Sequence, residues 1–291
     1  MVKEYLKLND PSRSRIMGFH STEKHLTDTI KNTKMNRLNF ETWQNFFTDL
    51  KGQGLGYSTI KRIRTDCSLA YTFAQNRGYN NVCYPKNVNI GKSPRKGQAK
   101  IFTHEEIWKL ACFHNVGNDA AQFAVDTALV MIYSGVRISE LLGIKNENIH
   151  FSESYFDITE AKTEAGVRQV PMHEAIKPII QKYYDKNNVY LFSMPNKKRY
   201  TYANYRDSYW DRLRDRLGWD EDMTPHNCRK TCASLLKEFK CDMTYEKLIL
   251  GHEGALDLTE KTYIHVEPKE LVKAINQIPT PINLEVELKL S

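Results

Sequence analysis

The stretch IGKSPRKGQAK, residues 90–100, is the feature that most constrains the fold of this 291-residue chain. It combines Gly, Pro and basic residues and has no apolar periodicity, which is typical of a linker between domains. A chain of this length is long enough for two ordinary domains, each with a core of its own. The sequence therefore predicts two separately folded domains joined by a basic linker over 91–102.

The net charge of +7 is unevenly distributed along the chain. Residues 1–100 contain 18 Lys and Arg against 7 Asp and Glu, a net +11, whereas residues 101–291 contain 24 against 28, a net −4. A basic first third is typical of a protein that binds a polyanion such as nucleic acid. An ordinary solvated basic surface would give the same count, so charge alone leaves both interpretations open.

The composition also indicates the cellular compartment. The longest apolar runs, such as 123–133, are too short and interrupted to cross a membrane, and the N-terminus MVKEYLKLND lacks the apolar segment of a secretory signal. Six cysteines in a chain of this size do not form a dense disulfide framework. We expect a cytoplasmic protein with reduced thiols, no membrane partner, no metal and no cofactor.

A zinc site is the alternative interpretation of the cysteines, using His226, Cys228, Cys232 and Cys241. Cys228 and Cys232 lie four residues apart in a helical run, without the paired C-x-x-C arrangement of a structural zinc site.

The part before the linker is predicted to be helical over 21–33, 40–52 and 58–77. In the third segment, one face carries apolar and small residues at helical spacing: Ile60, Ile63, Cys67, Ala70 and Ala74. Another face carries cationic and hydroxyl side chains suited to contacts with DNA phosphates: Lys61, Arg64, Thr65 and Ser68. With Arg95 and Lys96 of the linker, these are the candidate DNA-binding residues; a solvated helix face is the alternative.

The part after the linker is predicted to be mostly helical with one β-hairpin. Thr103 and Glu106 form a capping box that begins a helix. Segments 154–159 and 167–172 are the two arms of the hairpin, around the turn EAKTEAG. Helices are expected at about 173–186, 201–217, 226–238, 244–250 and 267–276, followed by a strand in INLEVELKLS. The fold class is therefore mainly α with a small antiparallel β-sheet.

An arginine interrupts the apolar run YSGVRISELLGI, residues 133–144. A buried, unpaired charge costs on the order of several kcal/mol. Arg137 must therefore be paired inside the fold or face a site that needs a fixed positive charge.

Other residues of the second part could complete such a site. His226 and Arg229 lie three residues apart in TPHNCRKTCASLL, hence on one helix face. Lys162 lies in the hairpin turn, and LGHEGALDLTEKTYIHV contains His252 and Tyr263. Each residue alone has a structural explanation. Together they supply two guanidiniums that clamp a phosphodiester, a phenol that attacks phosphorus and an ammonium that protonates the leaving alkoxide.

These segments resemble the motifs of the tyrosine recombinase (phage integrase) family. YSGVRISELLGI looks like the first arginine box, HNCRKTCASLL resembles the H-x-x-R box, and LGHEGALDLTEKTYIHV is similar to the L-G-H … Tyr segment. Upstream, NFETWQNFFTDLKGQGLGYSTIKRIRTDCSLAYTFAQNRG resembles the helical core-binding domain of the family. The resemblance extends from about residue 21 to residue 266.

The resemblance implies a role for each residue that would contact the phosphate. Arg137 and Arg229 would bind the scissile phosphate, His226 would hydrogen-bond it and assist proton transfer, and His252 would support the same phosphate. Glu140 would brace the site from behind.

The resemblance also implies which residues react. Tyr263 would be the nucleophile that forms a 3′-phosphotyrosyl link, with Tyr245 as the nearest alternative. Lys162 would be the general acid for the 5′-hydroxyl. The exchange would need neither ATP nor a metal, because the phosphotyrosyl bond conserves the energy of the phosphodiester.

The resemblance divides the chain as follows: an N-terminal extension at 1–20, a helical (SAM-like) core-binding domain at 21–90, the linker at 91–102, a catalytic domain at 103–266 and a tail at 267–291 for docking between protomers. A separate arm-binding domain is expected to be absent, naturally or by truncation. The implied form is a C-shaped clamp on double-stranded recombination sites, working as a homo-tetramer, with accessory DNA-bending proteins as further partners. The strand in 282–290 is the candidate for exchange between protomers.

The predicted function is integration or excision of a mobile element by a site-specific recombinase, nucleoid-associated or in the host cytoplasm if viral. Dimer resolution like that of Xer recombinases, relaxation by a type IB topoisomerase and a non-catalytic DNA-binding regulator are the alternatives.

Overall fold

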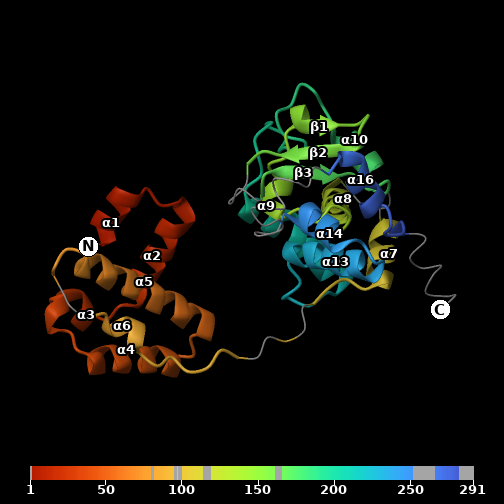
Figure 1. Ribbon diagram of the computed structural model, residues 1–291. Coiled ribbons are helices and arrows are strands. Elements are labelled where there is room, and N and C mark those ends of the chain that lie inside the picture. Colours follow the sequence, from red (N-terminus) through yellow and green to blue (C-terminus); the bar gives the residue numbers. More distant parts are fainter. Residues whose placement is uncertain are drawn as a thin grey trace. The chain divides into compact units, whose positions relative to one another are not determined.

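The computed structural model describes residues 2–79, 82–94, 97, 100–113, 119–160, 166–251 and 266–281. The chain divides into two compact units, Met1–Gly97 and Gln98–Ser291 (Figure 1). The described residues are mostly helical, and their named strands form a three-stranded antiparallel sheet, which confirms the predicted fold class. Within these ranges, the search for a helix that is both long and apolar enough to span a membrane found none.

The first unit consists of helices. They are α1 (Val2–Asn9), α2 (Arg13–His25), α3 (Asp28–Asn32), η1 (Met35–Arg37), α4 (Phe40–Gly52), α5 (Tyr57–Gln75) and α6 (Tyr84–Asn87). The single helix predicted over 21–33 is divided, because Leu26 and Thr27 adopt extended backbone angles and the Thr27 hydroxyl accepts a hydrogen bond from the Ile30 N–H at the start of α3. A threonine in this position replaces a missing intrahelical partner.

The core of this unit lies mainly between α4 and α5. Trp43, Phe46, Phe47 and Leu50 of α4 are buried, as are Ile60, Ile63, Cys67 and Tyr71 of α5. The Trp43 indole N–H donates to the Tyr71 hydroxyl at 2.9 Å, so the polar atoms of both rings are satisfied in the core. The apolar face predicted for the helix over 58–77 is thus the face that packs.

The first twenty residues, expected to form an extension, belong to the helical unit. Tyr5 of α1 packs edge-on against Phe19 of α2 and Phe73 of α5, with ring centroids 5.8 Å apart in both pairs. Asp66 of α5 is 2% exposed and bonds Arg15 and Thr22 of α2. Aromatic contacts, and an ion pair between the buried Asp66 and the partly exposed Arg15, therefore attach α1 and α2 to α5.

The second unit is the larger of the two. Its elements are α7 (His104–Phe113), α8 (Asp119–Ile132), α9 (Ile138–Leu141), η2 (Asn146–Asn148), β1 (Ile149–His150), β2 (Tyr155–Ile158), β3 (Arg168–Pro171), α10 (Lys177–Tyr183), α11 (Tyr202–Tyr205), η4 (Arg206–Trp210), α12 (Asp211–Leu217), α13 (Pro225–Glu238), α14 (Met243–Leu250) and α16 (Pro268–Ile275). The capping box of α7 is confirmed: the Thr103 N–H donates to Glu106 Oε2 at 2.7 Å, and the Glu106 N–H donates to Thr103 Oγ1 at 3.2 Å.

The sheet has the order β1-β2-β3, with antiparallel neighbours. Phe156 of β2 pairs with Val170 of β3 and with Ile149 of β1, and Phe156 and Val170 are fully buried. This confirms the predicted hairpin and adds β1, a two-residue strand too short to give a periodic signal. The helix predicted over 201–217 contains a π-helical turn at Arg206–Trp210.

The C-terminal helix α16 packs in its own unit, against β3 and α14. Leu271, Ile275 and Ile278 are buried. His173 Nε2 donates to the Ile278 carbonyl at 2.7 Å, and the Tyr133 hydroxyl donates to the Pro279 carbonyl at 3.2 Å. Of the tail expected to dock between protomers, the described part is therefore held by its own chain. The strand predicted at 282–290 lies outside the described residues.

Candidate active site

Arg137 projects from a short junction between the largely buried helix α8 and the short helix α9. Helix α8 ends at Ile132, and α9 begins at Ile138, directly after the arginine. Val136 and Leu141 on either side are fully buried, whereas the Arg137 side chain is 38% exposed. The apolar residues therefore fix the backbone on which Arg137 stands, and the guanidinium reaches the surface of the unit.

Gly135 makes the turn between these helices possible. Its φ is +67°, in the left-handed region that favours glycine, and a Cβ there would lie 2.6 Å from Leu250 Cδ2 and 3.1 Å from Cys232 Sγ. Its carbonyl accepts a hydrogen bond from Arg229 Nη1 at 2.6 Å. The glycine thus lets α13 and α14 approach the turn that precedes Arg137.

Arg229 lies on α13, whose start is well defined. Thr224 and Asn227 cap the helix, and Pro225 occupies its first turn, where a missing N–H costs nothing. Arg229 is 5% exposed and also donates, through Nη2, to the Leu250 carbonyl. Burial, and then the nearby positive charges of Arg137 and Arg168, lower the pKa of Arg229 to about 10, so the guanidinium is still protonated at neutral pH.

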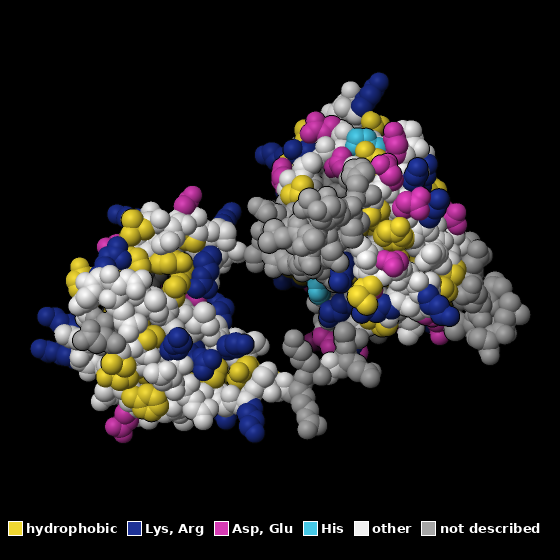
Figure 2. Space-filling view, viewed as in Figure 1, with side chains coloured by type: hydrophobic (Ala, Val, Ile, Leu, Met, Phe, Trp, Pro, Cys, Tyr) yellow, Lys and Arg dark blue, Asp and Glu magenta, His cyan; other side chains and the backbone are white. Residues whose placement is uncertain are grey.

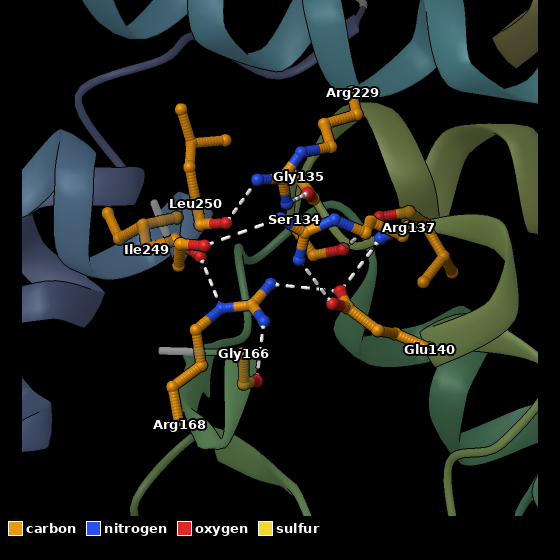
Figure 3. A network of polar contacts seen from close by, with 11 residues as sticks. Ser134, Gly135, Arg137, Glu140, Gly166, Arg168, Arg229, Ile249 and Leu250 are labelled. Carbon is orange, nitrogen blue, oxygen red and sulfur yellow. Dashed lines mark hydrogen bonds and ion pairs between the residues drawn. The ribbon is translucent and has the colours of Figure 1, made fainter. Parts of the chain in front are cut away.

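The C-terminal end of α14 is where the arginines converge (Figure 3). Arg168 donates to the Ile249 carbonyl at 2.9 Å, Arg229 donates to the Leu250 carbonyl, and Arg137 lies 3.4 Å from the Gly251 carbonyl. The last carbonyls of a helix lack intrahelical partners and carry partial negative charge, which favours nearby cations. Gly251, with φ +60°, ends the helix one residue before His252.

Glu140 is the carboxylate in this cluster. It is 4% exposed, accepts from the Arg137 guanidinium at 2.6 Å and backbone N–H at 2.9 Å, and accepts from Arg168 at 3.1 Å. Burial alone raises the pKa of a carboxyl, but the Arg168 and Arg137 interactions outweigh it and hold the pKa of Glu140 below its usual value. Glu140 is therefore ionised at neutral pH, and it orients both arginines.

We call Arg137, Glu140, Arg168 and Arg229 the arginine network. Three guanidiniums face one carboxylate within it, and the backbone carbonyls that share the guanidinium hydrogen bonds carry no formal charge. The network therefore has an excess of positive charge, which suits a group that binds an anion.

His226 lies three residues before Arg229 and is partly exposed at the start of α13. Partial burial, and then the positive charges of Lys230, Arg229 and Arg137, lower the pKa of His226. The imidazole is therefore neutral at pH 7 and can act as donor or acceptor toward a bound anion. The structure thus brings together four residues predicted from the sequence: Arg137, Glu140, His226 and Arg229.

Arg168 was missed by the sequence analysis. It is the first residue of β3, and its side chain is 7% exposed. Each nitrogen of its guanidinium donates one hydrogen bond: Nε to the Ile249 carbonyl, Nη1 to the Gly166 carbonyl and Nη2 to the Glu140 carboxylate. An arginine at the inner end of a hairpin arm was the available signal. Only the fold reveals that its partners are two carbonyls and a distant carboxylate.

The other predicted site residues lie outside the described residues: Lys162, His252 and Tyr263 of the reaction, and Arg95 and Lys96 of the linker. Two of the described residues next to these segments contact the network: the Gly166 carbonyl accepts from Arg168, and the Gly251 carbonyl lies 3.4 Å from Arg137 Nη2. Tyr245, the alternative nucleophile, is half-buried in the first turn of α14 and packs against the core.

The predicted DNA-binding face lies on α5 of the first unit. Lys61 and Thr65 are exposed, and Arg64 and Ser68 are half-buried. Arg64 Nη1 donates to the Val88 carbonyl at 3.2 Å, whereas the hydroxyls of Thr65 and Ser68 donate to carbonyls of their own helix. Figure 2 shows several Lys and Arg side chains close together on the visible face of this unit. DNA binding by these residues stays a prediction.

The zinc alternative gains no support from the cysteines. Cys228 and Cys232 are fully buried in the hydrophobic core, and burial raises the pKa of the Cys232 thiol to about 12. Among the described residues, the search for groups of three or more His, Cys, Asp or Glu that could hold a metal ion found none. These thiols therefore serve as small apolar side chains.

Known sequences provide the first comparison. The model of the phage integrase family matches residues 100–270. A tyrosine recombinase of Thermosipho africanus is 24% identical over 233 residues, which cover 79% of this chain and 79% of that protein. Tyrosine recombinase XerD of Caulobacter vibrioides is 24% identical over 258 residues, which cover 81% of this chain and 79% of that protein.

Solved structures provide the second comparison. The Tn1549 transposon integrase in complex with a circular intermediate DNA aligns with a TM-score of 0.76 at 18% identity, covering all of this chain and 98% of that one. A lambda integrase dimer bound to a COC′ core site aligns with a TM-score of 0.69 at 16% identity, covering 91% of this chain and 96% of that one. At these identities the likeness concerns the fold.

The family match covers more than half of the chain and includes the whole arginine network. The resemblance stated from the sequence motifs is therefore confirmed, and the chain belongs to the phage integrase family, the tyrosine recombinases, which are enzymes that cleave and rejoin DNA strands.

Proposed function

We propose that this protein is a site-specific tyrosine recombinase that exchanges DNA strands through a 3′-phosphotyrosyl intermediate and integrates or excises a mobile element. The observation that supports this most is the excess positive charge of the arginine network. The network contacts Gly251, the residue directly before the segment that contains His252 and Tyr263.

Arg137 and Arg229 would bind the two non-bridging oxygens of the scissile phosphate. Both guanidiniums are already held in place, by Glu140 and by the carbonyls of Gly135 and Leu250, so little order is lost when the phosphate binds. Fixed cations at this position stabilise the extra negative charge of the pentacoordinate transition state. His226 would donate a hydrogen bond to the phosphate and assist proton transfer, and His252 would support the same phosphate.

Tyr263 would supply the nucleophile and Lys162 the acid. The Tyr263 oxygen attacks phosphorus and loses its proton, a new P–O(Tyr) bond forms, and the bond from phosphorus to the 5′-oxygen breaks. The departing 5′-alkoxide takes a proton from Lys162. A 5′-hydroxyl of a second strand then reverses these steps and releases the tyrosine.

DNA would be bound chiefly through phosphate contacts from both units, including Lys61, Arg64, Thr65 and Ser68 of α5 and the linker residues Arg95 and Lys96. The lambda integrase fold neighbours include a tetramer bound to a Holliday junction. We propose a homo-tetramer for this chain on two DNA sites. Residues 282–290 would be the exchanged segment, because the chain from α16 to Pro279 is held by its own unit. Accessory DNA-bending proteins are further proposed partners.

The experiment that tests the chemistry is a nicked suicide substrate incubated with wild type and with Tyr263→Phe. The wild type should accumulate a covalent protein–DNA adduct and the variant none, because phenylalanine lacks the attacking oxygen. Tyr245→Phe is the matched control and should retain the adduct. An adduct equally abundant in Tyr263→Phe would overturn the assignment of the nucleophile.

Dimer resolution is the second candidate, and it is favoured by the curated relatives named XerD. A plasmid with two directly repeated copies of a cognate site, and a pair of plasmids with one copy each, separate the two roles. An integrase joins the separate plasmids, whereas a resolution enzyme acts on the repeated sites alone. Relaxation of supercoiled DNA without strand exchange would instead indicate activity like that of a type IB topoisomerase.

A further inference from the structure

Polar contacts link both flanks of the turn between β2 and β3 to α9. At the end that leads into β3, Arg168 Nη1 donates to the Gly166 carbonyl at 2.9 Å, and Nη2 of the same guanidinium donates to Glu140 of α9 at 3.1 Å. The side chain is almost fully buried, so these hydrogen bonds are little weakened by water. One residue therefore links Gly166 to the helix that begins directly after Arg137.

At the end that follows β2, Arg199 makes the corresponding link. Its Nη2 donates to the Ser139 carbonyl of α9 at 2.7 Å, and its Nη1 lies 3.4 Å from Glu160 Oε2. Lys145 approaches the other carboxylate oxygen of Glu160 at 3.5 Å. Surface ion pairs of this kind contribute little to stability. Their effect here is geometric, because they hold Glu160 against α9.

Gly143 gives the Arg199 guanidinium access to α9. A Cβ at position 143 would lie 2.6 Å from Arg199 Nη2 and 3.0 Å from its central carbon, Cζ. Any other residue at this position would displace the guanidinium from the Ser139 carbonyl. The contact thus depends on a glycine that no cap or left-handed turn requires.

We propose that Arg168 and Arg199 are positioning residues for proton transfer: each ties to α9 one of the described residues that flank the segment 161–165, Gly166 for Arg168 and Glu160 for Arg199, and loss of either slows the step in which Lys162 gives up its proton. The inference rests on the proposed function, which assigns the proton donor to Lys162. Neither arginine contacts the reacting atoms in this account. They act through Glu140, Ser139, Glu160 and Gly166.

A substrate whose leaving group needs no proton tests the inference. Suicide DNA carrying sulfur in place of the 5′-bridging oxygen releases a thiolate, whose conjugate thiol has a pKa of roughly 8.5, so loss of the acid no longer slows the step. Single-turnover cleavage of the oxygen and sulfur substrates is measured for wild type, Arg168→Gln, Arg199→Gln, Gly143→Ala and, as reference, Lys162→Ala. Arg206→Gln is the matched control, because the described ion pairs of Arg206 are with Asp207 and Asp211, close to it in the chain.

On the oxygen substrate, Lys162→Ala is expected to lose about 10²–10⁴-fold, and the two arginine variants about 10–100-fold, a usual loss for residues that orient catalytic groups. On the sulfur substrate, each of these losses should shrink at least tenfold, and Gly143→Ala should follow Arg199→Gln. A purely structural role would give equal losses on both substrates, and this result, or no loss at all, would overturn the inference.

Arg199→Gln is the safeguard against misfolding, since the Arg199 side chain is 35% exposed whereas Arg168 is buried. Failure of the proposed function gives a different result, because wild type would then form no adduct with either substrate. Failure of the inference alone leaves wild type active and the variants without rescue by sulfur.

Discussion

Each unit of the protein contains a buried carboxylate that bonds arginine, but the two clusters differ in charge balance. In the first unit, Asp66 of α5 forms an ion pair with Arg15 and accepts a hydrogen bond from the Thr22 hydroxyl, each at 2.6 Å, so one cation meets one anion. In the second unit, Glu140 faces Arg137 and Arg168, with Arg229 beside them. The first cluster is neutral, and the second has two positive charges in excess.

The balanced pair in the first unit holds helices together, whereas the cluster in the second unit has positive charge that could bind a ligand. The pair of Arg15 and Asp66, which joins α2 to α5, is neutral and needs no further charge to balance it. Burial, and then the positive charges of Arg137 and Arg168, disfavour the charged form of Arg229 and lower its pKa. A bound phosphate would supply the missing negative charge. The excess charge of the cluster in the second unit therefore supports the proposed phosphate site.

The largest expected effect concerns cleavage. Arg137→Ala should lower the rate of covalent adduct formation by about 10²–10³-fold, the usual loss when one fixed donor to a developing negative charge is removed. Arg15→Ala removes an arginine from the balanced cluster and should change the single-turnover rate at saturating protein by less than about threefold. Similar losses in the two variants would contradict the distinction between the clusters.

The second effect concerns stability and runs in the opposite direction. Arg15→Met leaves Asp66 buried without its cation and should destabilise the first unit by about 3–5 kcal/mol. Hydrogen exchange followed on peptides of each unit would show the change in the first unit alone. Arg206→Met, which removes a surface ion pair, is the control and should leave the free energy of unfolding almost unchanged, because water screens such pairs. A smaller change for Arg15→Met than for this control would show that the Asp66 pair is not structural.

A third effect separates backbone conformation from close packing. Gly135 and Gly218 have nearly the same φ, +67° and +68°, but a Cβ at Gly135 would meet Leu250 and Cys232, whereas nothing lies within 4 Å of one at Gly218. Both Ala variants should lose about 1–2 kcal/mol for the left-handed conformation. Gly135→Ala should lose about 1–3 kcal/mol more from overpacking and should also slow cleavage, because the Gly135 carbonyl orients Arg229. Equal unfolding free energies for the two variants in denaturant titrations would contradict the close approach.

The smallest effect is a dependence on pH. Burial lowers the pKa of His173, although its hydrogen bond to the Ile278 carbonyl opposes the shift. An unfolded histidine has a pKa of roughly 6.5, and the folded one protonates only at lower pH. Between the two values the unfolded state binds more protons, so stability falls as the pH decreases.

We expect the free energy of unfolding of the second unit to decrease between pH 7.5 and 5.5. His173→Asn should flatten this slope by at most about 1.4 kcal/mol per pH unit. Peptides of the first unit provide the internal reference for hydrogen exchange. An unchanged slope in His173→Asn would show that another group carries the pH dependence.

Local signals in the sequence determined much of this protein. The capping box at Thr103 and Glu106, the hairpin arms and the apolar face of α5 depend on residues a few positions apart. The same holds for the pairs Arg137–Glu140 and His226–Arg229, each three residues apart on one helix or at its start. The motifs were sufficient to recognise the family, and the roles of Lys162, His252 and Tyr263 stay predictions.

Only the tertiary structure decided how the site is held. Arg168 and Arg199 act through partners between 2 and 81 residues away, most of them backbone carbonyls. Every residue has a carbonyl, so such acceptors have no sequence signature. The same reason hid the attachment of α1 and α2 to α5, where Asp66 looks like any polar residue of a helix until Arg15 and Thr22 are brought to it. The sequence thus named the groups that would bind phosphate, and the fold determined which of them are balanced, which are in excess and what keeps them in place.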